Sequence, residues 1–357
     1  MDIDKIVKAF KALSPSEQEL FKNTILNEIE HSDKSKNANL EINEFVSESR
    51  FSKGIYCSHC KSEKFVRNGK TKDGGQRYLC KECHKTFTAT TNTLLSYTHK
   101  ELSIWKRYIH CMMSGMSIRK SAAECGITLR CSFLWRHKIL DALQQMQDGI
   151  RIDGIIEADE TFFRLSLKGN HKKSRNFKMP RSAHKRGGMI ERGKDQVCVP
   201  SAVNRNGLSV SKVGNLGNAT IESISTVLKR HIVEDLVLCS DGHIAYKKLA
   251  NEIHLKEHIR IVGGRGKVRG YYSVARINAY HSGLKTWMTR FKGVATKYLN
   301  NYLVWNNQVV WAKVADDEKE RTMLDFVIGV GLRTINNRNV DLKTMAQDVT
   351  LKINNIV

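Results

Sequence analysis

The chain has 357 residues, 41% of them hydrophobic, which excludes a wholly disordered protein and leaves room for more than one domain. Its formal net charge of +23 predicts a polyanionic partner; a membrane is not expected, because the sequence has no apolar run of about 18 residues and no secretory signal. We therefore expect a cytoplasmic, nucleoid-associated protein whose nine cysteines are reduced or metal-bound.

The first fifty residues divide into a helical part and a polar part. Residues 1–31 carry apolar residues at helical spacing, which predicts an N-terminal helical segment, either a small hairpin or a dimerising arm. A helix start is expected at Ser14 and Pro15, with Ser14 as the N-cap and Pro15 at the first helical position. Residues 32–50 are polar and lack periodicity, which predicts a linker.

Two Cys-X-X-Cys knuckles define residues 51–99. Cys57 and Cys60 form the first and Cys80 and Cys83 the second, with nineteen residues between them. This spacing is typical of a zinc ribbon, and four thiolates fill the tetrahedral shell of a structural Zn²⁺; a redox or iron site is the alternative. Basic residues in the ribbon suit either phosphate contact or a solvated face: Lys61, Lys64, Arg67, Lys70, Lys72, Arg77, Lys81 and Lys85.

Residues 100–147 predict three helices. Ser117 and Thr128 are the expected N-caps of the second and third, and Gly126 makes the turn between them. Helix, short glycine-containing turn and helix are typical of a helix-turn-helix DNA-binding domain, although a plain three-helix bundle has the same pattern. Four residues of the last helix are candidates for contact with the major groove of DNA: Arg130, Arg136, His137 and Lys138.

Residues 151–311 change to short apolar runs separated by helical patterns. Helices are expected at 220–232, 243–253 and 274–291, and strands at 152–159, 196–204, 208–213, 236–240 and 258–262. This order predicts an α/β domain with a mixed five-stranded sheet of the ribonuclease H kind. C-terminal helices are expected at 312–357. The basic insert at 164–194 predicts a flexible loop that orders on DNA through residues such as Lys172, Lys173, Arg175, Lys185 and Arg186.

Two aspartates follow predicted buried strands. Asp159 stands near the end of the first strand and Asp241 directly after a later one, so neighbouring strands would bring both carboxylates to one metal site. An aspartate at a strand end is also typical of a turn, and Asp241 precedes a glycine. Glu157 shares the strand face of Asp159 and is expected to support the site from behind.

The motifs, taken in order, resemble those of zinc-ribbon insertion-sequence transposases with a DDE-type catalytic core. The resemblance covers most of residues 55–310. It rests on the knuckles, the helix-turn-helix pattern, a strand with Asp159-Glu160-Thr161, the Ser240-Asp241-Gly242 element, and a helix running from Ile277 to Lys285. Many relatives have Glu at the third catalytic position, where this chain has Asn278; a subgroup of the family is thought to use Asn.

The resemblance implies Asp159, Asp241 and Asn278 as catalytic ligands of Mg²⁺ or Mn²⁺, with His281 and Glu157 as alternates. Lys285 and Lys297 are candidate phosphate contacts; alternatively, their side chains are solvated or packed in the core. The expected partners are double-stranded DNA, at the element's terminal repeats and at the target, and a second copy of the chain in a synaptic homodimer.

The sequence therefore predicts a DNA transposase that cuts and joins phosphodiesters with a divalent metal. Two alternatives stay open. One is a domesticated, catalytically inactive DNA-binding regulator, which the neutral Asn278 favours. The other is a metal-dependent nuclease without strand transfer.

Overall fold

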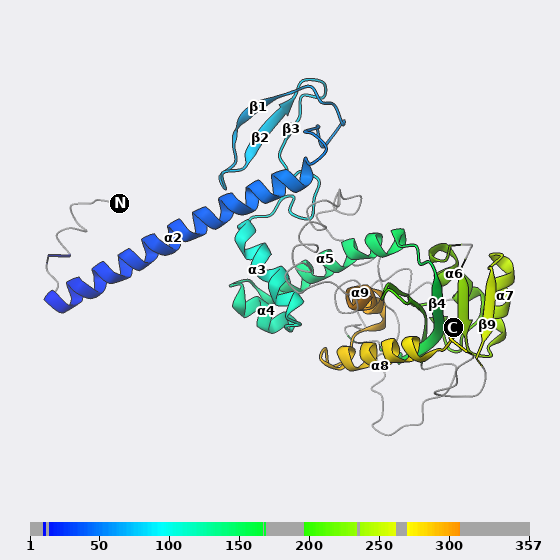
Figure 1. Cartoon of the computed structure of the whole chain (residues 1–357). Helices are drawn as coiled ribbons and strands as arrows, with labels where there is room; N and C mark the ends of the chain where they lie inside the picture. Colours follow the sequence, from blue (N-terminus) through cyan, green and yellow to red (C-terminus); the bar gives the residue numbers. More distant parts are fainter. Residues whose placement is uncertain are drawn as a thin grey trace, which may run out of the picture. The chain divides into compact units, whose positions relative to one another are not determined.

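The computed structural model describes six segments of the chain: 10–11, 14–166, 168, 196–233, 236–261 and 270–307. The described residues form two compact units, one ending at His110 and one beginning at Cys111, and each is described by itself (Figure 1). No helix among them is long and apolar enough to cross a membrane. The predicted C-terminal helices at 312–357 and nearly all of the basic insert at 164–194 lie outside the described residues.

Helix α2 (Pro15–Arg50) begins where the sequence predicts a helix start. The Ser14 hydroxyl accepts the N–H of Glu17, and the Glu17 carboxylate accepts the N–H of Ser14 at 2.9 Å, which makes a capping box with Pro15 in the first turn. The helix continues through residues 32–50, so the predicted linker was wrong.

The second half of α2 is helical because tertiary contacts stabilise it. Ile42 and Val46, four residues apart on one helix face, are buried, and the Asn43 amide donates to the carbonyl of Asp73 in the ribbon at 2.6 Å. The sequence of residues 32–50 does not reveal this helix, because the segment is mostly polar and the hydrogen-bond partner of Asn43 lies thirty residues further along the chain.

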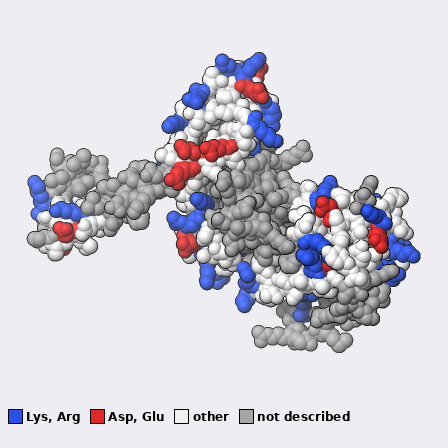
Figure 2. Space-filling view, viewed as in Figure 1, with Lys and Arg blue, Asp and Glu red and all other residues white. Residues whose placement is uncertain are grey.

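The zinc ribbon is a small antiparallel sheet in the order β1 (Phe65–Lys70), β2 (Gln76–Cys80) and β3 (Thr86–Phe87). Its core is aromatic: the Tyr78 and Phe87 rings stack at 5.2 Å, and Phe51 meets both edge-on. All eight basic residues noted in the ribbon sequence have exposed side chains, and Figure 2 shows Lys and Arg side chains over this part of the surface.

Three helices follow the ribbon: α3 (Leu102–Met113), α4 (Ile118–Glu124) and α5 (Leu129–Gly149). The predicted N-caps are confirmed, because the Ser117 hydroxyl accepts the N–H of Lys120 and the Thr128 hydroxyl accepts the N–H of Cys131. Gly126 has a φ of +58°, which a residue with a side chain rarely adopts, so the turn between α4 and α5 favours glycine.

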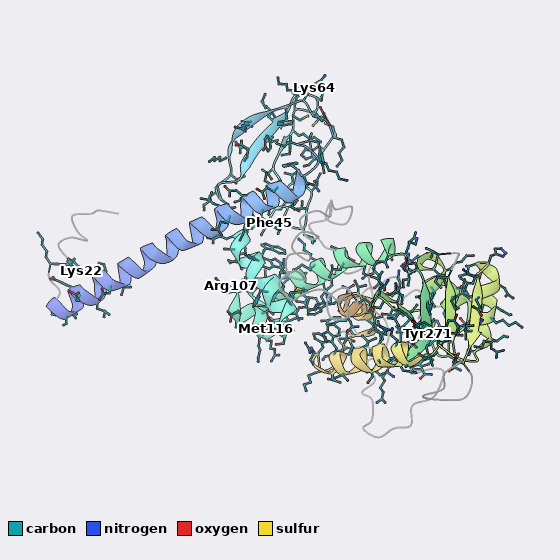
Figure 3. The ribbon with its side chains drawn as sticks, viewed as in Figure 1. Lys22, Phe45, Lys64, Arg107, Met116 and Tyr271 are labelled. Carbon is teal, nitrogen blue, oxygen red and sulfur yellow. The ribbon has the colours of Figure 1, made fainter. Side chains whose placement is uncertain are left out.

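Arg136 does not have the position predicted for a DNA contact. Its side chain is fully buried, and Nη2 donates to the carbonyl of Met116 at 2.8 Å and to the hydroxyl of Ser121 at 3.1 Å (Met116 is labelled in Figure 3). The guanidinium also lies 5.2 Å from the Trp305 ring. The prediction was wrong because a basic residue on the inner face of α5 stabilises packing instead of facing solvent.

His137, beside Arg136, is buried as well. Its ring lies 4.5 Å from that of Phe133 and 4.3 Å from that of Tyr298, and its Nδ1 is 3.2 Å from the side-chain amide of Asn301. Burial lowers the pKa of His137 to about 3, with help from the positive charges of Arg136 and Lys297. The ring is therefore neutral at pH 7.

The second unit is built on a mixed six-stranded sheet. The strand order is β6-β5-β4-β8-β9, and β7 pairs with β5. Strand β5 is antiparallel to both of its neighbours, β4 and β6, whereas β8 and β9 run parallel to β4. The sheet therefore has six strands and not the predicted five, because the two-residue β7 pairs with β5. The bounds are β4 (Ile155–Arg164), β5 (Gln196–Asn204), β6 (Ser209–Ser211), β7 (Asn215–Leu216), β8 (Val237–Ser240) and β9 (Glu257–Arg260).

Helices cover both faces of this sheet. Helices α6 (Ile221–Leu228) and α7 (Ile244–Glu252) pack on one face, where Ile156 and Ala158 of β4 join residues such as Ile224 and Leu249 in a common core. Helix α8 (Ala275–Thr289) contacts β4 and β5 and carries Tyr280, which hydrogen-bonds Ser211 of β6. Single-turn 3-10 helices at Lys229–His231 and Thr296–Tyr298 and helix α9 (Leu299–Trp305) complete the unit.

A buried polar network ties α5 to the sheet. The Asn307 amide donates to the Gln147 side chain of α5 at 2.6 Å and to the hydroxyl of Ser211 at 3.2 Å. The Tyr280 hydroxyl donates to the Asn307 side-chain oxygen at 2.5 Å. Because unmatched polar groups are costly in a protein interior, this network fixes α5, α8 and β6 in one arrangement.

Because His137 is buried and neutral, we expect the free energy of unfolding to fall in mild acid. Its ordinary pKa is about 6.5 and its pKa in the fold is about 3, so between these values the unfolded chain binds an extra proton and unfolding becomes easier as the pH falls. Between pH 7 and 5.5 the wild type should lose about 1 kcal/mol more than His137→Gln. Urea unfolding of both proteins at the two pH values measures this difference, and an equal loss would contradict the assignment.

Candidate functional site

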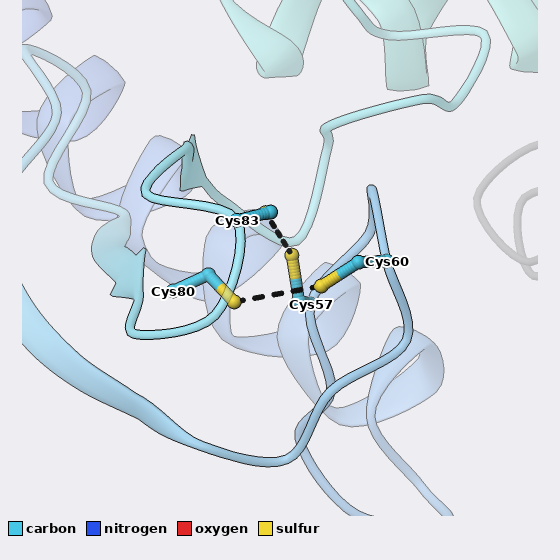
Figure 4. A group of neighbouring side chains, drawn as sticks. All are labelled: Cys57, Cys60, Cys80 and Cys83. Carbon is cyan, nitrogen blue, oxygen red and sulfur yellow. Dashed lines mark hydrogen bonds between the residues drawn. The ribbon is translucent and has the colours of Figure 1, made fainter.

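The four knuckle cysteines converge in the ribbon (Figure 4). The Sγ atoms of Cys57 and Cys83 are 3.6 Å apart, those of Cys60 and Cys80 are 3.5 Å apart, and all four lie within 4.8 Å of one another. Tetrahedral zinc with sulfur at about 2.3 Å requires sulfurs about 3.8 Å apart, so this geometry fits Zn²⁺. Among the residues that the structure describes, this is the one such cluster of potential ligands.

Local backbone structure builds each knuckle. Lys61 and His84, the residues after the second cysteine of each pair, have positive φ values of 67° and 54°, which turn the chain back toward the first cysteine. Hydrogen bonds from the N–H groups of Cys83 and Glu82 lower the pKa of Cys80 to about 6, which favours the thiolate that a metal requires. His59 and His84 lie outside the cluster, so the four sulfurs form a complete shell.

Asp159 and Asp241 meet at one edge of the large sheet. Strands β4 and β8 are adjacent and parallel, and Ala158 pairs with Ser240, so the next residue of each strand is an aspartate. Their charges interact, because Asp241 raises the pKa of Asp159. The strand register therefore brings Asp159 and Asp241 together, as the sequence predicts.

The loop that carries Asp241 is fixed by hydrogen bonds. The Asp241 carboxylate accepts the N–H of His243 at 2.9 Å, which leads into α7. The Ser240 hydroxyl lies 2.8 Å from Nε2 of His258 on β9, and Arg260 donates to the carbonyl of Gly242 at 3.0 Å. Strand β9 thus holds the turn in place, a role that its short sequence did not indicate.

The carboxyl group of Asp159 is half-buried beside other carboxyl groups. Burial raises its pKa, and the nearby Asp241 raises it further. Burial also raises the pKa of Glu160 to about 8, and the charges of Asp159 and Asp241 add to this shift. The sequence alone does not indicate a role for Glu160, yet its carboxyl group interacts with that of Asp159. Three carboxyl groups at one sheet edge repel one another, and a bound cation would relieve that repulsion.

Glu157 connects the strand to helix α8. Its buried carboxylate accepts the backbone N–H groups of Arg276 at 2.7 Å and Ile277 at 3.1 Å, and the hydroxyl of Ser273 at 3.3 Å. These donors belong to the first turn of the helix, whose partial positive charge favours a carboxylate. Glu157 therefore acts as the cap of α8, in line with its expected supporting position.

Helix α8 presents His281 to Asp159. Nδ1 of His281 lies 3.7 Å from the nearer carboxylate oxygen of Asp159, which is too long for a hydrogen bond. Burial and, to a smaller extent, the positive charge of Lys285 lower the pKa of His281 to about 4, so the ring is neutral at pH 7 and the contact is not a salt bridge. Asn278 is exposed one turn earlier, and its amide nitrogen donates to the carbonyl of Val274 at 2.8 Å.

The residues predicted to contact DNA are placed as follows. Arg130 and Lys285 are exposed, Lys138 and Lys297 are half-buried, and Arg136 is buried. Lys285 is close enough to lower the pKa of both Asp159 and His281. The basic residues of the insert lie outside the described part of the chain: Lys172, Lys173, Arg175, Lys185 and Arg186.

Loss of one knuckle ligand tests the zinc site. Cys57→Ser should release the ion and unfold the ribbon, and binding to element-end DNA should weaken, because the ribbon has few strands and depends on the metal. Cys131→Ser, which changes a half-buried cysteine outside the cluster, is the matched control. Zinc content and DNA affinity are measured on both proteins; specific DNA binding by zinc-free Cys57→Ser would reject the structural role.

Substitution of Glu157 tests its role as the cap of α8. Glu157→Ala removes the acceptor for two helix N–H groups and should destabilise the protein by about 1–3 kcal/mol. Glu157→Gln keeps one oxygen acceptor and should lose less. Urea unfolding measures both variants, and equal stability of Glu157→Ala and wild type would rule out the cap.

Comparisons with known proteins match both regions. Residues 151–312 match the ISXO2-like transposase domain, and residues 52–84 match the InsA N-terminal domain, a zinc ribbon. An uncharacterized protein in transposable element ISH50 of Halobacterium salinarum is 26% identical over 255 residues, which cover 71% of this chain and 84% of that protein.

A crystal structure of a pre-cleavage Mos1 transpososome is similar over 63% of this chain and 78% of that chain, with 6% identity and a TM-score of 0.19, a likeness too weak to argue from. The family matches agree with the four-cysteine cluster and with the mixed sheet that carries the paired aspartates. The chain therefore carries an ISXO2-like transposase domain at residues 151–312, preceded by a zinc ribbon of the InsA kind at residues 52–84.

Proposed function

We propose that this transposase cuts the ends of its element and joins them to target DNA with Asp159, Asp241 and Asn278 as the catalytic ligands of Mg²⁺ or Mn²⁺. The supporting domain is a ribonuclease H-like core, in which three antiparallel strands are extended by two parallel ones. The observation that carries the proposal is the parallel pairing of Ala158 with Ser240, since it sets two carboxylates side by side at a sheet edge.

The donor atoms fit hard divalent cations. Asp159 and Asp241 supply carboxylate oxygens and Asn278 supplies an amide oxygen, the ligand types that Mg²⁺ prefers. Within the described residues, Oε1 of Glu160 and Nε2 of His281 are buried without a hydrogen-bond partner. Divalent cations held by these residues would neutralise charge on the attacking and leaving oxygens of a phosphodiester.

Each residue has a distinct task. Asp159 and Asp241 would bind the cations that neutralise the reacting phosphate. Neutral His281 packs beside Asp159. Asn278, His281 and Lys285 are spaced three and four residues apart, so they share one stripe of α8. This spacing supports Asn278 as the third ligand, with His281 as the alternate, and Lys285 as a contact for a DNA phosphate.

The chemistry proceeds in two displacements. In the first, water attacks the phosphodiester at the element's end, and the bond to the 3′ oxygen breaks to release a 3′ hydroxyl. In the second, this hydroxyl attacks a phosphorus of the target and forms a new phosphodiester bond, while the bond to the target's 3′ oxygen breaks and leaves a target 3′ hydroxyl. No side chain of the protein serves as the nucleophile.

DNA binding is assigned to the basic elements outside the sheet. The exposed lysines and arginines of the ribbon contact phosphates, and α4 and α5 act as a helix-turn-helix in which exposed Arg130 stands at the start of the second helix. A homodimer brings the two element ends together. A catalytically inactive DNA-binding regulator is the second candidate, and the uncharged Asn278 is the observation that favours it.

Alanine substitutions test the catalytic assignment. Asp159→Ala and Asp241→Ala should each reduce cleavage and strand transfer by more than about 100-fold, because a lost metal ligand costs more than a lost supporting contact. Asn278→Ala should reduce both reactions as well, and more strongly than His281→Ala if the amide is the third ligand. Cleavage and joining of element-end DNA are measured with Mg²⁺ or Mn²⁺ and with EDTA.

Asp153→Ala is the matched control, because Asp153 is an exposed aspartate just before the same strand. It should keep full activity, and all variants should bind DNA like the wild type. Equal, metal-independent behaviour of every variant would favour the inactive regulator. Cleavage without joined product in the wild type would favour a nuclease.

A further inference from the structure

A cavity of about 640 Å³ opens beside the first turns of α8. Its lining includes Glu157, Arg205, Tyr271, Ser273, Arg276 and Ala279. The two displacements described above use none of the arginines or the tyrosine. The volume lies in the range of small-molecule sites, about 300–1,000 Å³, and exceeds what a single phosphate group fills.

Arg205 and Tyr271 form one wall of the cavity. The guanidinium lies 3.9 Å from the centre of the Tyr271 ring, and Nη2 donates to the Tyr271 carbonyl at 2.8 Å. Arg205 stands in the turn between β5 and β6, where the Asn204 side chain accepts the N–H groups of Asn206 and Leu208. A rigid turn therefore holds Arg205 against a segment sixty-six residues further along the chain.

The Tyr271 ring stays open to solvent despite this contact. The residue is 71% exposed and stands just before α8, where Figure 3 labels it. Nε of Arg205 is buried and has no hydrogen-bond partner among the described residues. The Tyr271 ring is held in place by Arg205 but remains exposed, so another flat group can stack on it. The Arg205 guanidinium retains N–H donors for an anionic ligand.

The cavity lies next to the proposed catalytic edge. Glu157 lines it, and Asp159 is two residues further along β4 on the same face of the strand. Two residues of a strand span about 7 Å. This is about two base steps of one DNA strand, at 3.4 Å per step. A nucleotide near the reacting phosphate can thus reach the cavity.

We propose that this cavity holds one nucleotide turned out of the DNA stack within about two positions of the reacting phosphate. The base stacks on Tyr271, and Arg205 and Arg276 contact its phosphates. A base in a duplex cannot reach an aromatic pocket without leaving the stack, so the site would open the helix locally. The proposal rests on the proposed function of the same site, because it takes the bound strand to be the substrate.

Fluorescence of 2-aminopurine tests the pocket apart from the chemistry. Duplexes that carry the element's terminal sequence, with 2-aminopurine at each of the positions flanking the cleavage point, are bound to the Asp159→Ala protein, which cannot cut. Fluorescence should rise at one position. It should fall back toward the free-duplex level when Tyr271→Ala is added and should persist with Tyr271→Phe, which keeps the ring.

Tyr97→Ala is the matched control, since Tyr97 is 80% exposed and belongs to the other unit. In the cleavage-competent protein, Tyr271→Ala should lower cleavage about five- to a hundred-fold, the usual effect of losing one base–aromatic stack. A mismatch at the responsive position, which already unpairs the base, should restore much of this loss.

Unchanged fluorescence at every position, or a signal that Tyr271→Ala leaves intact, would overturn the proposal. The two failures are distinguishable: a Tyr271-dependent signal in a protein whose wild type never cleaves keeps the pocket and rejects the proposed chemistry. Normal cleavage by Tyr271→Ala with no fluorescence change in any protein keeps the chemistry and rejects the pocket.

Discussion

The bond between Glu157 and the first turn of α8 is the contact on which the candidate site depends. The helix carries Asn278, His281 and Lys285, and the strand carries Asp159, but nothing in the covalent chain fixes one against the other. Two backbone N–H groups of the helix bind one buried carboxylate of the strand. A charge buried in this way is stable because the helix terminus supplies both hydrogen bonds and positive potential.

Three acidic residues within four positions of β4 have three different environments. Glu157 is buried and capped by a helix, Asp159 faces the open edge beside Asp241, and Glu160 is held in a half-buried position with a raised pKa. The alternation of side chains along a strand separates neighbours, while the helices that cover each face decide what each carboxylate meets. The carboxyl group therefore has three different roles: Glu157 caps a helix, Asp159 is a candidate metal ligand, and Glu160 interacts with Asp159.

The basic residues divide in a similar way. In the ribbon, lysines and arginines point outward from an aromatic core and stay available to phosphates. On α5, exposed Arg130 and buried Arg136 are separated by six residues of one helix, and only the first can face a ligand. A high net charge indicates a polyanionic partner for the whole chain, but the burial of each side chain decides which charges can contribute.

The sequence by itself determined the zinc ligands, the helix caps at Ser14, Ser117 and Thr128, and the order of strands and helices around Asp159 and Asp241. These features depend on spacing and on local hydrogen bonds, which residues close in the chain specify. Tertiary structure decided the rest. Residues 32–50 are helical although most of them are polar, with Ile42 and Val46 buried and Asn43 bonded to Asp73 of the ribbon. Arg136 is buried and donates to the carbonyl of Met116, twenty residues away, and Glu157 caps a helix about 120 residues away. Such outcomes depend on partners that a local pattern does not contain.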